Sequence, residues 1–134
     1  MIHKEGEAYI SYGIDGGVGR EDSLGIAHFN GMIIFRTGGG EVTLPFNSLH
    51  RNQWTHYAMT FKKGVIVGLV NGKVVGKAPG TVKVKSTRAA LARHWWGNGV
   101  GTSTRLQAAM DDVRVYKRAL EPSQIKYLVD VTRD

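Results

Sequence analysis

The stretch near the end of the chain, Met110–Ile125, constrains the fold more than any other. Val113 and Val115 alternate there with polar residues, which predicts a strand with one buried face. Pro122 then suits the first turn of a helix, where its missing N–H costs nothing. The small apolar stripe of that helix consists of Ile125, Leu128 and Val129. A core strand followed by a short helix is therefore expected at the end of the chain.

Before this stretch, short runs of aromatic and β-branched residues alternate with glycine-containing turns, as in an all-β domain. Asn30–Gly31 and Asn71–Gly72 are strong signals for two-residue hairpin loops. The expected strands cover residues 8–14, 24–29, 32–36, 41–44, 53–61, 65–70, 73–76 and 81–85, with another near Leu91. Together with the helix, they predict an antiparallel β-sandwich with one short C-terminal helix, forming one domain over residues 1–134.

The longest of these runs, residues 53–61, carries large apolar groups on both faces. Alternate positions from Tyr57 to Phe61 share one face, and Trp54 lies on the other. A strand with two apolar faces is expected in the middle of a sandwich. The pattern therefore predicts that Trp54 is a core residue and that His56 is hydrogen-bonded within the sheet.

Three of these motifs together resemble a known family, the LamG-like jelly-roll domains of the concanavalin A-like class. The closing sequence MDDVRVYKRALEPSQI resembles the family's IDDVRIYNRALSxxEI motif. Gln53–Phe61 resembles its W-x-H-x-A-x-T strand, and Leu69–Val75 resembles its LYVNGK-V hairpin. The resemblance covers about residues 30–129 and implies a concanavalin A-like jelly roll.

The resemblance also implies a module cut from a larger exported or surface protein, so an extracellular or cell-surface location is expected. The first residues have no apolar core like that of a signal peptide, and no run approaches the roughly 18 apolar residues that span a bilayer. Family domains begin with further strands, and this chain is expected to lack them. A missing strand leaves an open sheet edge, which predicts a dimer or higher oligomer.

Composition and motifs give little support to catalysis. The chain has no cysteine, which excludes disulfides and thiolate metal sites. Glycosidases of similar fold use an E-x-D-x-x-E pattern, which is absent here, and the five histidines are dispersed. We therefore expect the protein not to be an enzyme. The net charge of +7 favours polyanions such as sulfated or uronic polysaccharides or nucleic acid, or it only keeps the domain soluble.

Trp95 and Trp96, in a glycine-rich stretch, are the main candidates for binding a ligand. Adjacent residues of an extended chain point in opposite directions, so one indole is expected inside and the other exposed. An exposed indole offers a flat face for stacking a sugar ring or a base. Donors for the same site would come from Arg93, His94 and Arg105. The alternative is that both tryptophans only pack against the fold.

Asp111 and Asp112 are the main metal candidates, because calcium prefers several carboxylate and carbonyl oxygens. Some relatives of this fold hold calcium at the rim of the sandwich, and Asp15 and Asp22 could add ligands. The alternative is that Asp111 accepts a backbone hydrogen bond while Asp112 pairs with an arginine or lysine.

Three functions remain open from the sequence. The first is a non-catalytic module that recognises a glycan, with an anionic glycan as one option. The second is a protein-interaction or self-assembly module that uses an open sheet edge. Nucleic-acid binding is the third, and it rests on charge alone.

Overall fold

The computed structural model describes residues 13–14, 25–29, 32–45, 53–82, 89–90, 95–96, 99–100 and 111–132. The strands in these ranges are β1 (Gly13–Ile14), β2 (Gly25–Phe29), β3 (Met32–Thr37), β4 (Gly40–Pro45), β5 (Tyr57–Lys62), β6 (Val65–Val70), β7 (Lys73–Pro79), β8 (Ala89–Ala90), β9 (Trp95–Trp96) and β10 (Gly99–Val100). The helix is α1 (Pro122–Val131). The strands predicted for residues 24–76 are present, with ends shifted by a few residues. The predictions for residues 8–12, 83–85 and Leu91 lie outside the described ranges.

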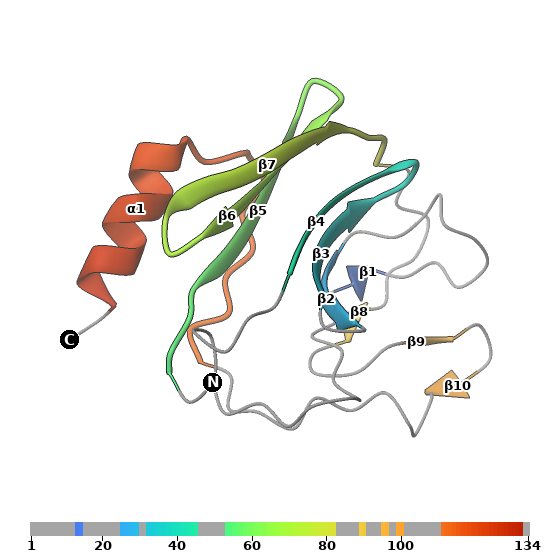
Figure 1. Cartoon of the computed structure of the whole chain (residues 1–134), viewed down its shortest axis with the longest axis horizontal. Helices are drawn as coiled ribbons and strands as arrows, with labels where there is room; N and C mark the ends of the chain where they lie inside the picture. The colour runs from blue at the N-terminus through green and yellow to red at the C-terminus, as the bar shows by residue number, and fades with distance from the viewer. Residues whose placement is uncertain are drawn as a thin grey trace.

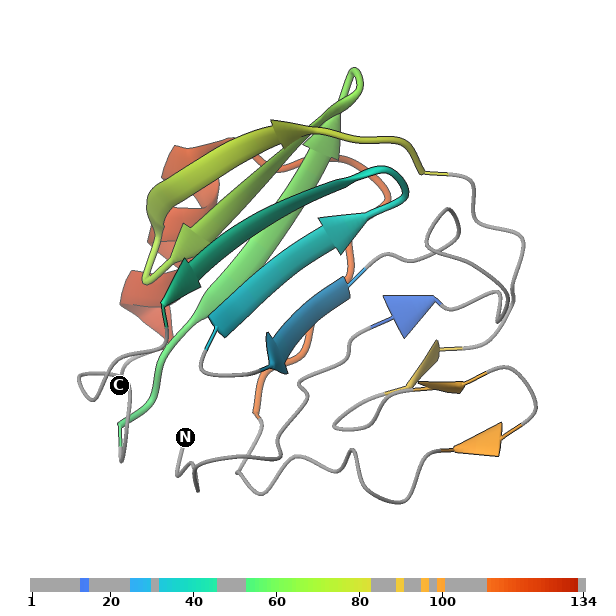
Figure 2. The same ribbon diagram turned by 45° about the vertical axis from the view of Figure 1, so that its right-hand side comes forward.

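Two three-stranded antiparallel sheets form the layers of the fold. One contains β2, β3 and β4, and the other contains β5, β6 and β7, each in sequence order. Figures 1 and 2 show β4 of the first sheet lying beside β7 of the second. The short strands form two further antiparallel pairs, β1 with β8 and β9 with β10. The predicted all-β antiparallel fold with one C-terminal helix is confirmed.

The hydrophobic core lies between the two sheets. Ile33 and Phe35 of β3 and Ile66 of β6 are fully buried, and they form one cluster with Val42 and Val70. Three alternating residues of β5 pack against this cluster, namely Tyr57, Met59 and Phe61. These three residues thus share one face, as the alternation predicts, but β5 lies at one end of the described β5–β6–β7 sheet rather than at the predicted central position.

Glycines allow the two layers to approach closely. A Cβ atom at Gly68 of β6 would lie 2.7 Å from Cδ2 of Phe35, and one at Gly76 of β7 would lie 2.5 Å from Cγ1 of Val42. Both distances are much shorter than a carbon–carbon contact at optimal separation, about 3.5–4.0 Å. The absence of a side chain at these two positions therefore sets how near β6 and β7 lie to the opposite sheet.

The turn between β6 and β7 has the geometry that its sequence predicts. Asn71 and Gly72 have φ angles of 48° and 75°, as a type I′ turn requires. The Asn71 backbone N–H donates to the His56 carbonyl at 2.8 Å, and the His56 backbone N–H donates to Asn71 Oδ1 at 3.0 Å. His56 is thus hydrogen-bonded through its backbone just before β5, and the structural role predicted for its side chain stays a prediction.

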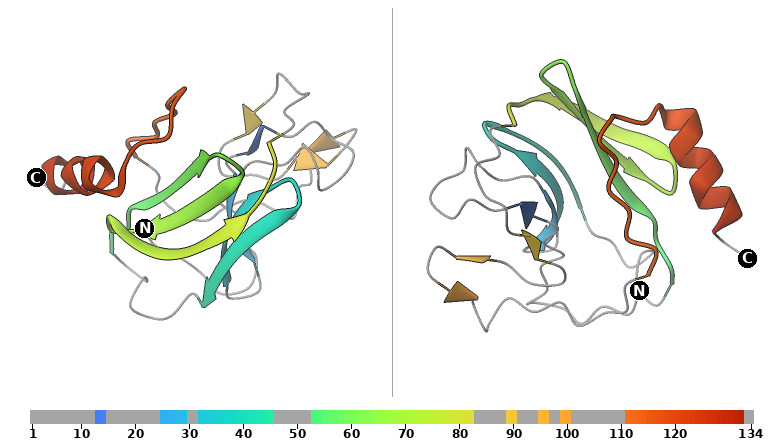
Figure 3. Two further views of the ribbon diagram at one scale, coloured as in Figure 1. Left: turned by 90° about the horizontal axis from the view of Figure 1, so that it is seen from above. Right: turned by 180° about the vertical axis from the view of Figure 1, so that it is seen from behind.

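Helix α1 lies on the side of the β5–β7 sheet away from β2–β4 (Figure 3). It buries Ile125 and Val129, as its apolar stripe predicts. The Glu121 backbone N–H donates to Gln124 Oε1 at 3.0 Å, which satisfies one amide at the helix start. Lys62 at the end of β5 forms a 2.9 Å ion pair with Glu121, and this pair lowers the pKa of the Glu121 carboxyl.

Two predictions about the core are wrong. Trp54 is 64% exposed, because β5 begins only at Tyr57 and the tryptophan precedes the sheet. Residues 111–120, here called the closing segment, form no strand, and Val113 and Val115 are 46% and 63% exposed. No described strand forms hydrogen bonds with this segment. The valines therefore alternate with polar residues, as predicted, but neither face of the segment is buried.

The close contact between Gly68 and Phe35 predicts the effect of a small substitution. Gly68→Ala should destabilise the fold by about 1–3 kcal/mol, because the buried ring cannot move away from the added methyl group. Urea unfolding gives this value, and Lys77→Ala on an exposed part of β7 should change stability by less than about 0.5 kcal/mol.

A double-mutant cycle tests the stated cause. In a Phe35→Leu background the ring is gone, so Gly68→Ala should cost clearly less than it does in the parent chain. If Gly68→Ala destabilises both backgrounds equally, the added methyl group clashes with a group other than the Phe35 ring.

Tyr57 gives the fold a predicted dependence on alkaline pH. Burial raises its pKa from 10.0 to about 12, and a hydrogen bond with Thr55 lowers it in part. Since the folded-state pKa lies above the unfolded value, the stabilisation is complete below about pH 10 and is lost as the pH rises toward 12. The loss should be on the order of 1–2 kcal/mol after allowance for the half-buried position of the ring.

Urea unfolding at several pH values from 9 to 12 measures this effect. Tyr57→Phe cannot ionise at this position, so its stability should fall less steeply over the same range. If stability falls equally with pH in the two proteins, the loss of stability at alkaline pH comes from other groups, such as the lysines.

Candidate functional site

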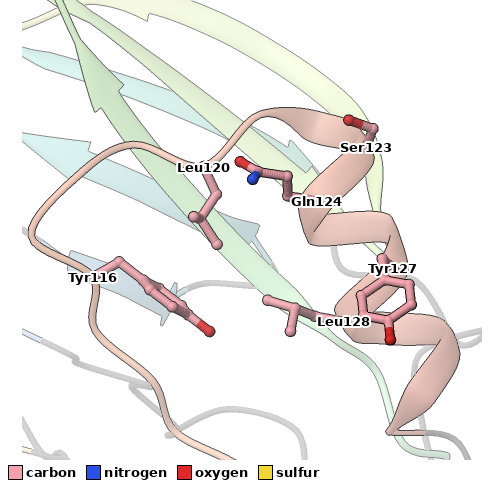
Figure 4. A pocket seen from close by; sticks show the side chains of 6 residues that line it. All are labelled: Tyr116, Leu120, Ser123, Gln124, Tyr127 and Leu128. Atoms are coloured by element: carbon pink, nitrogen blue, oxygen red, sulfur yellow. The ribbon is translucent and has the colours of Figure 1, made fainter.

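An open groove lies between the closing segment and helix α1. Its volume is about 400 Å³, and Figure 4 shows side chains from both elements projecting toward it. The closing segment supplies two of them and α1 the other four; the lining residues are Tyr116, Leu120, Ser123, Gln124, Tyr127 and Leu128. The two tyrosines are 45% and 66% exposed. The groove is thus mainly apolar, with an aromatic ring from each of its two elements.

Tyr116 is held by a chain of polar contacts within the closing segment. Arg114 forms a hydrogen bond with Tyr116, and its Nε atom lies 2.6 Å from Asp112 Oδ1. The hydrogen bonds to Tyr116 and to Asp112 raise the pKa of the Arg114 guanidinium. Arg114 therefore ties the tyrosine to a residue four positions earlier in an otherwise exposed segment.

The helix side of the groove offers hydrogen-bonding groups. Gln124 Oε1 accepts from the Glu121 N–H at 3.0 Å and from Arg118 Nη1 at 3.4 Å. The amide NH₂ group of Gln124 makes no hydrogen bond to the part of the chain that the structure describes, and neither does the Ser123 hydroxyl. Both groups are available to a ligand, beside two exposed aromatic faces.

Trp95 and Trp96 form the short strand β9 within the glycine-rich stretch. Trp96 lies opposite Gly99 and Trp95 opposite Val100 in the antiparallel pair with β10. Arg93, His94 and Arg105 lie outside the described residues, so the binding roles predicted for these five residues stay predictions.

The two aspartates have the contacts of the structural alternative. Asp111 Oδ1 accepts the Asp112 backbone N–H at 2.7 Å, and Asp112 pairs with Arg114. Calcium takes about 6–8 oxygen ligands, and the described residues hold no group of three or more acidic or histidine side chains suited to a metal. The described donors do not fit calcium by themselves. Asp15 and Asp22 lie outside the described ranges, so a site that includes them stays a prediction.

The groove was not found from the sequence. Tyr116 and Leu120 precede Pro122, whereas Tyr127 and Leu128 follow it, and only the turn into α1 brings the two sets together. A useful signal would have been a tyrosine–leucine pair on each side of the predicted helix start. Tyr116 and Leu120 precede it, four residues apart, and the adjacent Tyr127 and Leu128 follow it.

Three comparisons with known proteins place this geometry in context. A family model described as the concanavalin A-like lectin/glucanases superfamily matches residues 4–126, a longer stretch than the motifs alone suggest. A crystal structure of an S-layer domain-containing protein (residues 221–444) from Clostridium thermocellum is 22% identical, with a TM-score of 0.51. That match covers 96% of this chain and 65% of the solved one. No curated protein matches.

Of the helical segments that the structure describes, none is long and apolar enough to cross a membrane. The family match covers most of the chain, and the two antiparallel sheets agree with the fold that the match implies. The chain therefore belongs to the concanavalin A-like lectin/glucanases superfamily.

Proposed function

We propose that this domain is a non-catalytic carbohydrate-binding module, and that the groove between the closing segment and α1 contacts the sugar. The observation that supports this most is the pair of exposed rings, Tyr116 and Tyr127, beside polar groups of the helix that make no hydrogen bond within the described part of the chain. Membership of a superfamily of lectins and glucanases agrees with a carbohydrate ligand, although the fold alone does not decide function.

The groove has the two kinds of surface that a sugar ring needs. Aromatic faces bind the apolar C–H face of a ring, and the polar groups of Ser123 and Gln124 suit its hydroxyls. A volume of about 400 Å³ lies in the usual range for small-molecule sites, about 300–1,000 Å³. The groove is therefore large enough for a short oligosaccharide unit rather than a long chain.

Anionic sugars are the preferred ligands in this proposal. Lys117 and Arg118 are exposed next to Tyr116, and the chain carries a net charge of +7. Sulfate or carboxylate groups on the sugar would be attracted to these cations, more strongly at low salt. Trp95 and Trp96 are a second candidate contact, for the end of a longer glycan.

The same proposal includes the setting of the domain. A similar fold occurs in an S-layer domain-containing protein, which supports a cell-surface or extracellular location. Hydrolysis is not part of the proposed function, because the chain lacks the E-x-D-x-x-E pattern. Prolonged incubation of the protein with each bound oligosaccharide, followed by chromatography, should give no shorter products.

The binding test uses a panel of neutral, sulfated and uronic oligosaccharides at near-physiological salt, measured by calorimetry. Tyr127→Ala should weaken binding of the best ligand about 5- to 150-fold, as expected for the loss of one stacked ring worth about 1–3 kcal/mol. Tyr127→Phe keeps the ring and should retain most of the affinity.

Matched variants locate the site. Val131→Ala, an exposed change on the same helix but outside the groove, should leave binding unchanged. If Trp95→Ala or Trp96→Ala abolishes binding while Tyr127→Ala does not, the sugar binds at β9 and the groove is not the site. Absence of binding to every oligosaccharide would reject the carbohydrate function, and a requirement for calcium would assign Asp111 and Asp112 as ligands.

A further inference from the structure

The closing segment has the properties of an unpaired strand. Every residue from Asp111 to Lys117 is exposed, and Val113 and Val115 expose 46% and 63% of their surface. The segment runs as a drawn-out stretch along the outer side of β5 before it enters α1 (Figure 3). Two exposed valines among alternating polar residues leave an apolar strip without a covering partner in the described part of the chain.

Within the part of the chain that the structure describes, the backbone of this segment is also unpaired. From Val113 to Arg118, the peptide groups make no hydrogen bonds to the described residues, and the segment belongs to none of the described sheets. Unpaired N–H and C=O groups on a drawn-out, partly apolar segment are a template for pairing with another strand. A partner strand would satisfy these groups and cover the valines at the same time.

We propose that the closing segment pairs in antiparallel fashion with the closing segment of a second copy of this chain, around a two-fold axis at Val115. This goes beyond the proposed carbohydrate function and does not depend on it. In such a pair the same surface is used by both copies, so each residue must be compatible with the residue opposite it.

Two-fold symmetry and local geometry select the register. A two-fold axis through an antiparallel pair must pass a residue, so the possible centres in this segment are the residues from Val113 to Lys117. Centring on Arg114 or Lys117 would place two like charges directly opposite each other, which is destabilising. Centring on Tyr116 would place Arg114 opposite the partner's Arg118, with the same result. Centring on Val113 would require Asp112 to lie in the paired strand, but its φ of 53° is far from extended backbone. Val115 remains.

The selected register is complementary along its length. The two Val115 side chains face each other, and Val113 lies opposite the aliphatic stem of the partner's Lys117. Arg114 lies opposite Tyr116 of the partner subunit, where a guanidinium can stack on the ring. Beyond the paired residues, Asp112 and the partner's Arg118 carry opposite charges, so the ends of the two segments do not repel each other. The directly opposed pairs are therefore apolar or aromatic–cationic, and none of them joins like charges.

Cysteine cross-linking gives a sharp test, because the chain has no cysteine of its own. Directly opposed residues of an antiparallel pair have Cα atoms about 4.5–5.5 Å apart, which suits a disulfide. Val115→Cys should therefore form a disulfide-linked dimer under mild oxidation at least about tenfold faster than Val113→Cys. In the Val113→Cys dimer the two introduced sulfurs would be about 13 Å apart along the strand, at four residues of about 3.3 Å each.

A solution measurement tests the same contact without a cross-link. The parent protein should show a concentration-dependent monomer–dimer equilibrium in sedimentation velocity, and Val115→Lys should shift it to monomer. Val74→Lys, the same change at an exposed valine on β7, should leave the equilibrium unchanged, and circular dichroism should confirm that both variants fold.

Several outcomes would overturn the proposal. Equal cross-linking of Val115→Cys and Val113→Cys would indicate random collision, and faster cross-linking at position 113 would exclude the register. A parent protein that stays monomeric at high concentration, together with a Val115→Cys variant that does not cross-link, would exclude self-pairing altogether.

Discussion

The close contact between the two sheets at Phe35 is the constraint on which the rest of the fold depends. The fully buried ring fills the space over Gly68, and Val42 fills the space over Gly76. Because interiors are packed at nearly crystalline density, these contacts fix the spacing of the sheets. They also fix the turn between β6 and β7, where Lys126 of α1 lies against Gly72. The position of the helix therefore follows from the packing of the core.

The two walls of the groove are held by different forces. Helix α1 is fixed mainly by the burial of Ile125 and Val129. This burial contributes more than the exposed ion pair with Lys62, because solvent screens such surface pairs. Tyr116 stands instead on an exposed segment and is held by its contact with Arg114. The helix side of the groove is thus part of the packed fold. The side formed by the closing segment depends on local polar contacts and on any partner that covers the segment.

Much of this architecture could be predicted from the sequence, where local rules decide the outcome. Spacing within a few residues predicts the Asn71–Gly72 turn, the face that Tyr57, Met59 and Phe61 share in β5, and the apolar stripe of α1. The errors at Trp54 and at the closing segment have a different origin. Alternation predicts which residues share a face, but not whether a neighbouring strand exists to cover that face. The groove was missed because its two sides come from opposite sides of the turn at Pro122.

The two proposals have a joint structural consequence. A two-fold axis at Val115 lies one residue from Tyr116, so it would place the grooves of the two copies near each other. Two weak sites held at a fixed separation bind a repetitive polymer more tightly than either site alone, because the second contact becomes intramolecular. Since a groove of about 400 Å³ contacts only a short unit of glycan, pairing through the closing segment would supply the avidity that a single groove lacks. The exposed valines would then contribute to recognition without contacting the sugar.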